Sequence, residues 1–250
     1  MDIANRISSM VVALEQSASI SIAEKARELK EKGLNIIDLS WGEPYFDTPA
    51  KIKNSAKIAL DKNFTHYTSS KGSMELREAI REKMINENNI DYTPEEILVT
   101  PGAKQAIFYA VYTLVEKNCE VLVPEPYWLS YRDIIKIAGG KTVPVPTFED
   151  NGFKPTYEHI ASKITDKTKA IIINSPNNPT GSVLDKGHFK VIAEISQEHD
   201  LVVISDEIYE KIIFDGRHHY SIASFPGMNE RTITINGFSK AFAMTGWRLG

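Results

Sequence analysis

The feature that most constrains the fold is a repeated order of apolar strand and helix that begins near residue 95. Strand-like apolar runs are expected at 97–100, 120–123, 141–145, 170–174, 201–205 and 232–235. Helical patterns fit between several of them, at 104–115, 129–137 and 189–198. Alternation of this kind predicts an α/β fold, in which helices cover both faces of a mostly parallel sheet.

The first part of the chain carries separate helix signals. Helices are predicted over 20–32, 48–61 and 73–88, with a short strand over 35–39. Gly33 would stop the first helix, Thr48 would be the N-cap of the second with Pro49 at its first position, and Ser73 would cap the third. In the loop after the short strand, Gly42 leaves the backbone open to close approach by a ligand.

Composition excludes several classes of protein. The 250 residues carry a net charge of −4 without a cluster of Lys and Arg, which argues against a nucleic-acid partner. Cys119 is the single cysteine, so no disulfide framework or multi-cysteine metal site is possible. No signal peptide or membrane-spanning run is recognised, and a cytoplasmic location is expected.

The histidines offer no metal site. The chain has six of them, scattered along the sequence. His218 and His219 fall in a polar loop without metal-ligand spacing, and both are predicted to face solvent. No Ser-His-Asp arrangement stands out either. The sequence therefore predicts neither a metal centre nor a serine hydrolase.

Ligands of parallel sheets bind beyond the carboxyl ends of the strands, so the residues that follow each strand are the candidates. Gly102, Ala103 and Lys104 follow the first strand and open a helix, where free N–H groups and the helix dipole favour a phosphate. The glycines of a GxGxxG or GxxxxGK[ST] motif are missing, which argues against a Rossmann dinucleotide site and a P-loop.

Other strand ends carry aromatic and polar side chains. Trp128 follows the second strand, where it offers either an aromatic face to a ligand or a core contact. Asn178 lies in the turn-rich run Asn174 to Gly181, which fixes an amide in place. Asp206 and Tyr209 follow a buried strand three residues apart, so both can reach one ligand if a helical turn starts there.

The segment NGFSKAFAMTGWRLG ends the sequence and holds Lys240 and Arg248. A lysine among small and apolar neighbours loses hydration as the ammonium, so its pKa falls and the amine becomes a nucleophile. An arginine offers a planar fork for an oxyanion such as phosphate. Alone, both residues would be read as surface charges.

Together these strand ends resemble the class I and II aminotransferases, which are pyridoxal-phosphate enzymes of fold type I. The nearest subgroup resembles the prokaryotic aspartate aminotransferases. The resemblance runs through the whole chain in the family's order and is carried by Gly42 to Pro44, Tyr67, Gly102 to Gln105, Tyr127 and Trp128, Asn174 to Gly181, Ser205 to Tyr209 and Ser239 to Arg248. It implies a three-layer α/β/α large domain.

The resemblance also implies roles for the site residues. Lys240 would form the internal aldimine and then act as the catalytic base. Asp206 would pair with the pyridine nitrogen, while Tyr209 and Asn178 would hydrogen-bond the phenolic oxygen of the cofactor. Trp128 would stack on the ring. The phosphate would be held by Gly102, Ala103, Lys104, Ser239, Arg248 and, from a partner subunit, Tyr67.

Substrate, partner and domain expectations follow from the same resemblance. Gly42, Trp128, Asn178 and Lys104 would contact the substrate, and Lys104 would favour the distal carboxylate of aspartate or glutamate. The shared Tyr67 implies a homodimer. Residues 1–47 would belong to a small domain, and residues 48–250 would form the large cofactor-binding domain.

Two departures from the family qualify these expectations. Gly237 stands where many relatives have a phosphate-binding serine. The sequence also stops at Gly250, before the last sheet strand, most of the small domain and the arginine for the substrate α-carboxylate. An N-terminal portion with little activity of its own is therefore expected. A β-lyase with the same cofactor, or a non-catalytic module that binds the cofactor or an amino acid, are the alternatives.

Overall fold

The computed structural model describes residues 6–12, 14, 18–38 and 42–250. The chain divides into two compact units, Met1–Pro44 and Tyr45–Gly250. In the first unit the predicted helix 20–32 is confirmed as α2, Ala18–Glu31, which follows a short helix α1, Ser9–Val12. The predicted strand 35–39 is wrong over 35–38, which have no regular structure, and residues 39–41 lie outside the described part.

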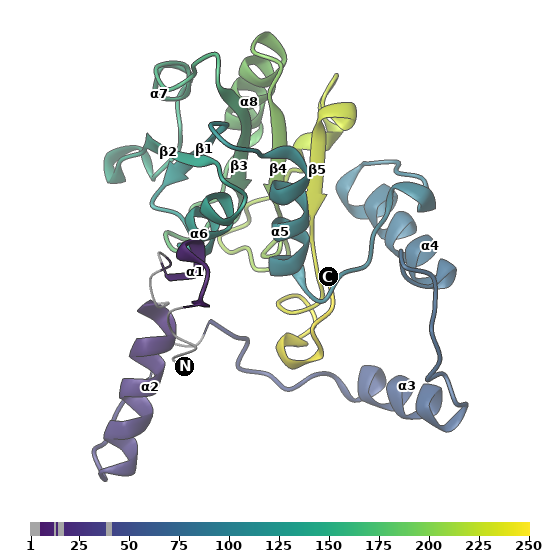
Figure 1. Cartoon of the computed structure of the whole chain (residues 1–250). Helices are drawn as coiled ribbons and strands as arrows, with labels where there is room; N and C mark the ends of the chain where they lie inside the picture. Colours follow the sequence, from purple (N-terminus) through teal and green to yellow (C-terminus); the bar gives the residue numbers. More distant parts are fainter. Residues whose placement is uncertain (1–5, 13, 15–17, 39–41) are drawn as a thin grey trace. The chain divides into compact units, whose positions relative to one another are not determined.

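The second unit is built on a five-stranded parallel sheet in the order β2-β1-β3-β4-β5. Its strands are β1 Glu120–Glu125, β2 Lys141–Pro146, β3 Thr168–Asn174, β4 Val202–Asp206 and β5 Thr232–Ile235. The register sets Asn174 beside Asp206 and Asp206 beside Ile235. The carboxyl ends of β3, β4 and β5 are therefore level, and residues that follow them meet at one edge (Figure 1).

Helices cover both faces of this sheet, as predicted. Ala170 and Ile172 of β3 pack toward α5, Ala103–Leu114, and α6, Ser130–Ile137. Ile171 and Ile173 pack toward the opposite layer, which contains α7, Tyr157–Ala161, and α8, Lys186–Glu198. Alternate residues of a strand point to opposite faces, so an unbroken apolar run contributes to both cores. The α/β/α prediction is confirmed.

The segment between residues 50 and 100 supplies two further helices, α3, Ala50–Asp61, and α4, Met74–Lys83. The predicted cap of α4 is confirmed, because the Ser73 side chain accepts the Leu76 N–H at 3.3 Å. A π-helical turn, Met84–Asn88, continues α4. Single 3-10 turns lie at Pro94–Glu96, Glu149–Asn151, Ile222–Ser224, Asn229–Arg231 and Thr245–Trp247.

Two local predictions in this unit are wrong. Thr48 is not the N-cap of α3, which is Pro49; the Thr48 hydroxyl instead donates to the Ala243 carbonyl and accepts from the Trp247 indole. Residues 97–100 do not form a strand. Their Val99 N–H donates to the Lys71 carbonyl, and Thr100 exchanges two hydrogen bonds with Gly250. These contacts lead to two different segments, so no continuous ladder forms.

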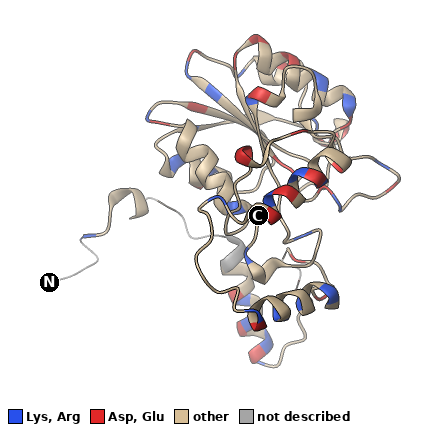
Figure 2. Cartoon of the chain, turned by 90° about the vertical axis from the view of Figure 1, so that its right-hand side faces the viewer, with Lys and Arg blue, Asp and Glu red and all other residues tan. Residues whose placement is uncertain are grey.

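Charge is spread rather than clustered. Figure 2 shows Lys and Arg interspersed with Asp and Glu on helices and loops, while the strands are largely uncharged. Within the described ranges, every helix is too short or too polar to cross a membrane.

Candidate active site

The centre of the site is Asp206, the last residue of β4, whose side chain is 97% buried. One carboxylate oxygen, Oδ2, accepts the hydroxyl of Tyr131 at 2.6 Å, and the other, Oδ1, accepts the Ile208 N–H at 3.2 Å. Burial raises the pKa of Asp206 from 3.8 to about 6, although these two hydrogen bonds lower it, and the nearby charge of Glu207 raises it further. A carboxylate held this way strongly favours a cationic partner.

The turn after β3 brings an amide toward this carboxylate. Asn174 donates to the Asp206 carbonyl at 2.9 Å, and its own side-chain oxygen accepts the Asn178 N–H at 2.7 Å. The Asn178 amide in turn lies 3.4 Å from the Tyr209 hydroxyl. The level ends of β3 and β4 thus bring Asn178 and Tyr209 together.

Lys240 lies on the same side, in the segment after β5. Its Nζ atom is 5.8 Å from the centre of the Tyr209 ring. Tyr209 is half-buried, and burial followed by the charge of Asp206 raises the pKa of its hydroxyl. The phenol is therefore neutral. Its oxygen accepts the Asn178 amide N–H, which leaves its own proton to donate to a ligand.

The Trp128 ring contacts two other side chains of the site, Tyr131 and Lys104. Its ring meets that of Tyr131 edge-on, with centroids 5.4 Å apart and planes at 90°. The Nζ atom of Lys104 lies 4.9 Å from the Trp128 ring centre, a cation–π distance. The first turn of α5 is thereby connected to the residues around Asp206.

An anion-binding geometry forms where α5 begins. Gly102 is its N-cap with a φ of 92°, and a β-carbon there would lie 2.7 Å from Nη2 of Arg248. The N–H groups of Ala103 and Lys104 open the helix, where intrahelical acceptors are missing. Arg248 also donates to the Thr245 carbonyl at 2.9 Å. A guanidinium against a helix N-terminus provides both charge and directed donors for a phosphate.

Three further residues, Ser239, Tyr67 and Gly42, are expected to contact the cofactor or substrate. Ser239 is buried directly before Lys240. Tyr67 is fully exposed, at 107% of its reference area. Gly42 belongs to the other unit, and its role stays a prediction.

The position of Gly237 is crowded. A β-carbon there would lie 3.0 Å from Cδ1 of Ile208 and 3.2 Å from the Leu249 carbonyl oxygen. These distances are tighter than ordinary contacts, so a serine would require its neighbours to move. The small residue at this position therefore fits the packing around it.

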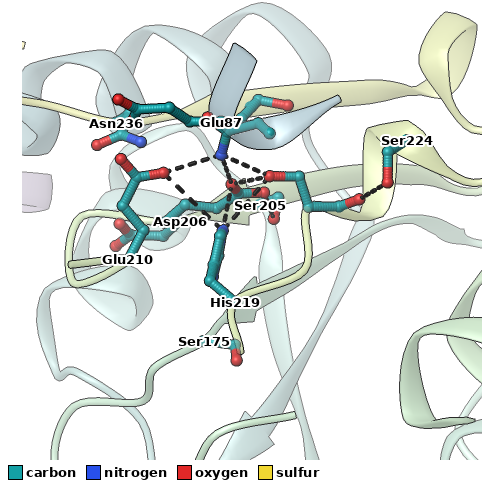
Figure 3. A network of polar contacts seen from close by, with 12 residues as sticks. Glu87, Ser175, Ser205, Asp206, Glu210, His219, Ser224 and Asn236 are labelled. Carbon is teal, nitrogen blue, oxygen red and sulfur yellow. Dashed lines mark hydrogen bonds and ion pairs between the residues drawn. The ribbon is translucent and has the colours of Figure 1, made fainter. Parts of the chain in front are cut away.

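Sequence reasoning missed a polar cluster after β4, which consists of Glu207, Glu210, His219, Ser221 and Asn88. Figure 3 shows Glu210 and His219 within this network. The prediction that His219 faces solvent is wrong, since its Nε2 lies 2.8 Å from a Glu207 oxygen and its side chain is 89% buried. The loop that carries it folds back over β4, which local polarity does not reveal.

The carboxylates of this cluster have donors from the protein itself. Glu207, Glu210 and His219 place one ligand atom each within 4.8 Å of one another, a spacing suited to a cation. The Asn88 amide nitrogen, however, lies 2.8 Å from Glu210 and 2.8 Å from Ser221, and Lys83 forms an ion pair with Glu210. Burial alone would raise the pKa of Glu210, but Lys83 brings it below the ordinary value. We therefore interpret the cluster as a structural network.

Fold and site together define a protein of the aminotransferase class: the model of the family "aminotransferase class I and II" matches residues 35–250, and the chain belongs to this family. The family uses pyridoxal phosphate. Two curated relatives are similar at high identity. An aspartate aminotransferase of Pyrococcus abyssi is 54% identical over 217 residues, and an aromatic-amino-acid aminotransferase of Thermococcus litoralis is 52% identical over 216.

Each alignment covers 86% of this chain and 56% of the relative. Among solved structures, the aspartate aminotransferase of Thermus thermophilus with maleate superposes with a TM-score of 0.94 at 43% identity. That alignment covers 98% of this chain and 63% of the other. The chain thus spans less than two thirds of the length of these relatives.

Proposed function

We propose that the protein is a pyridoxal-phosphate-dependent aminotransferase that moves an amino group from an L-amino acid to a 2-oxo acid by a ping-pong mechanism. The observation that carries the proposal is the buried Asp206 carboxylate, with Tyr209, Asn178 and Lys240 gathered near it. Such an anion matches a protonated pyridine nitrogen, which few other ligands would offer beside a lysine.

The residues present fit this cofactor at each of its parts. The phosphate would be held by Arg248, Ser239 and the N–H groups at Gly102, Ala103 and Lys104, a fit supported by the close approach of the Arg248 guanidinium to Gly102. Trp128 would cover one face of the ring, and Asp206 would pair with its nitrogen. Asn178 and Tyr209 would donate to its phenolic oxygen.

When bound, the cofactor supplies an electron sink for the pair released at the substrate Cα. The Nζ atom of Lys240 would anchor the cofactor aldehyde covalently, take the Cα proton of the substrate and return it one position away. The Asp206 carboxylate would stay ionised beside the ring nitrogen and hold a proton on it. Tyr209 would keep its hydroxyl proton, consistent with the raised pKa, and so remain a donor.

For the amino donor we propose aspartate or glutamate. Lys104 is exposed at the start of α5 and lies over Trp128, where it supplies a positive charge for a distal carboxylate. The similarity to a protein solved with maleate, a dicarboxylate, supports this choice. The 52% identity to an aromatic-amino-acid aminotransferase favours aromatic donors as the second candidate. Substituting Lys104→Ala should lower kcat/KM for aspartate at least tenfold more than for phenylalanine.

We also propose a homodimer in which Tyr67 reaches the phosphate of the partner's site. Its complete exposure, with Phe64, Leu60 and Ile58 also exposed nearby in sequence, supports a covered role in an assembly. Gly42 would contact the substrate as part of a small domain to which residues 1–47 belong, and residues 48–250 would form the large domain. The single Cys119 supports a reducing, cytoplasmic location.

Addition of pyridoxal phosphate to the whole protein tests the proposal. We expect a new near-visible absorbance band, which Lys240→Ala should abolish and the matched surface change Lys190→Ala, on α8, should preserve. Amino transfer from aspartate to 2-oxoglutarate should follow. Absence of the band in the wild type would overturn the proposal. Pyruvate release from cystathionine without transfer would identify a β-lyase, and the band without either reaction a binding module.

A further inference from the structure

Tyr131, in the first turn of α6, contacts the two main elements of the ring site, although its position in the sequence gave no functional signal. Its side chain is 99% buried. Its hydroxyl donates to Oδ2 of Asp206 at 2.6 Å, and its ring edge meets Trp128 at 5.4 Å. One side chain therefore contacts both the residue expected to face the ring nitrogen and the residue expected to cover the ring.

In the hydrogen bond between Tyr131 and Asp206, the Tyr131 hydroxyl is the donor. Burial, followed by the charge of Asp206, raises the pKa of the Tyr131 hydroxyl well above its ordinary value of 10. The phenol therefore stays protonated near neutral pH, where an ionised Asp206 accepts its hydrogen bond. Because the Ile208 N–H holds the other oxygen of Asp206, the carboxylate is fixed at both ends and its rotation is blocked.

We propose that Tyr131 is a positioning residue, which aims the Asp206 carboxylate and the Trp128 ring at one bound group and helps to keep Asp206 ionised. This inference rests on the proposed function for the identity of the bound group. The hydrogen bond between Tyr131 and Asp206 forms within the protein itself, so its effect on Asp206 can be measured without a cofactor.

Other charged and titratable groups act on Asp206 from the elements around it. Glu207 follows it in the chain and opposes its ionisation, while the Tyr209 hydroxyl senses its charge. Lys240 lies beyond Tyr209, in the segment after β5. None of these groups is altered by a change at position 131, so a shift in the titration of Asp206 reports the lost donor.

Tyr131→Phe tests the proposal, because it removes the hydroxyl and keeps the ring. Carbon-13 NMR of labelled aspartate in the whole protein, assigned with Asp206→Asn, gives the titration midpoint of Asp206. We expect the midpoint to rise by about one pH unit and the Kd for pyridoxal phosphate to rise roughly tenfold. The matched control is Tyr157→Phe, which removes another tyrosine–carboxylate hydrogen bond, 2.8 Å to Glu198 at the surface.

An unchanged midpoint and Kd in a folded Tyr131→Phe protein would overturn the proposal and leave Tyr131 as a core residue. If this variant does not fold, 3,5-difluorotyrosine at position 131 replaces it. The fluorinated phenol is a stronger donor, so the midpoint of Asp206 should then fall instead of rise, and an unchanged midpoint would overturn the proposal. Wild-type protein that fails to bind pyridoxal phosphate would refute the proposed function, whereas the titration would still decide the role of Tyr131.

Discussion

Asp206 and Glu207 are neighbours in the chain at the end of β4, and both are almost fully buried, yet their surroundings differ. Asp206 accepts from one hydroxyl and one backbone N–H. Glu207 is surrounded by the side chains of Ser205, Ser221, His219 and Asn88. The first carboxylate retains unused acceptor capacity, and the second is saturated by the protein.

We interpret the first carboxylate as part of the proposed cofactor site and the second as part of a structural network. An ionised carboxylate can accept about four hydrogen bonds, and burial without them penalises its charge. Asp206 bears that penalty, visible in its raised pKa of about 6, and a cationic ligand would relieve it. Glu207 already accepts hydrogen bonds from the protein. Its contribution is therefore to hold the loop that carries His219 and Ser221 against β4 and the π-helical turn after α4.

The largest effect is expected at the saturated carboxylate. Glu207→Ala should lower the free energy of unfolding by about 3–5 kcal/mol, because His219 and three other donors lose a buried acceptor. Urea denaturation of the whole protein at pH 7 measures it. Glu198→Ala, which removes a surface carboxylate bonded to Tyr157, should cost less than about 1 kcal/mol. Equal losses would contradict the distinction between the two carboxylates.

At Asp206, removal of the carboxylate should raise the free energy of unfolding instead of lowering it. The raised pKa means that this residue contributes stability below about pH 3.8, which is lost as the pH rises through about 6. Without cofactor, Asp206→Asn should therefore be more stable than the wild type by about 3 kcal/mol at pH 7, with the gain vanishing near pH 4. Denaturation curves of both proteins between pH 4 and 8 give the difference. A constant difference would show that Asp206 does not bear a burial penalty.

The smallest effect should come from removing one of several donors. Ser205→Ala deletes the hydroxyl 2.9 Å from Oε1 of Glu207, while Ser221 and His219 still hold Oε2. We expect a loss of about 1–2 kcal/mol in the same urea measurement. The exposed Ser55→Ala, whose hydroxyl bonds only a helix carbonyl, serves as the control. A loss as large as that of Glu207→Ala would mean that the cluster is not redundant.

Much of the sheet could be predicted from the sequence because its strands are short apolar runs between turn residues. Five of the expected strands are confirmed within two residues at each end, and the helices between them follow. The run 97–100 is also apolar, but a strand forms only where a neighbouring strand pairs with it along its length. The local sequence pattern does not show which distant segments pair with each other. The prediction that Thr48 caps α3 is wrong for a similar reason, because the distant residues Ala243 and Trp247 hydrogen-bond the hydroxyl that a cap would use.

The site could be anticipated where its residues follow strand ends or match family motifs, as Asp206, Asn178 and Lys240 do. Tyr131 and the Glu207 cluster could not. From the sequence, Tyr131 is predicted to be a core aromatic residue of an amphipathic helix. Its hydroxyl has a polar partner only because the fold brings Asp206 within 2.6 Å of it. Asn88 lies 119 residues before Glu207 in the chain, and only the folded backbone brings it to Glu207 and Ser221.

The anion-binding end of the site, where Gly102 faces Arg248, has a consequence for how the protein acquires its function. The two residues are separated by more than half of the chain, and all five strands lie between them. Closing so long a loop carries an entropic cost, and contacts of this range are slow to form. The proposed phosphate site should therefore form only when the sheet is complete, so that a phosphate-bearing ligand would bind fully folded molecules and shift the folding equilibrium toward them.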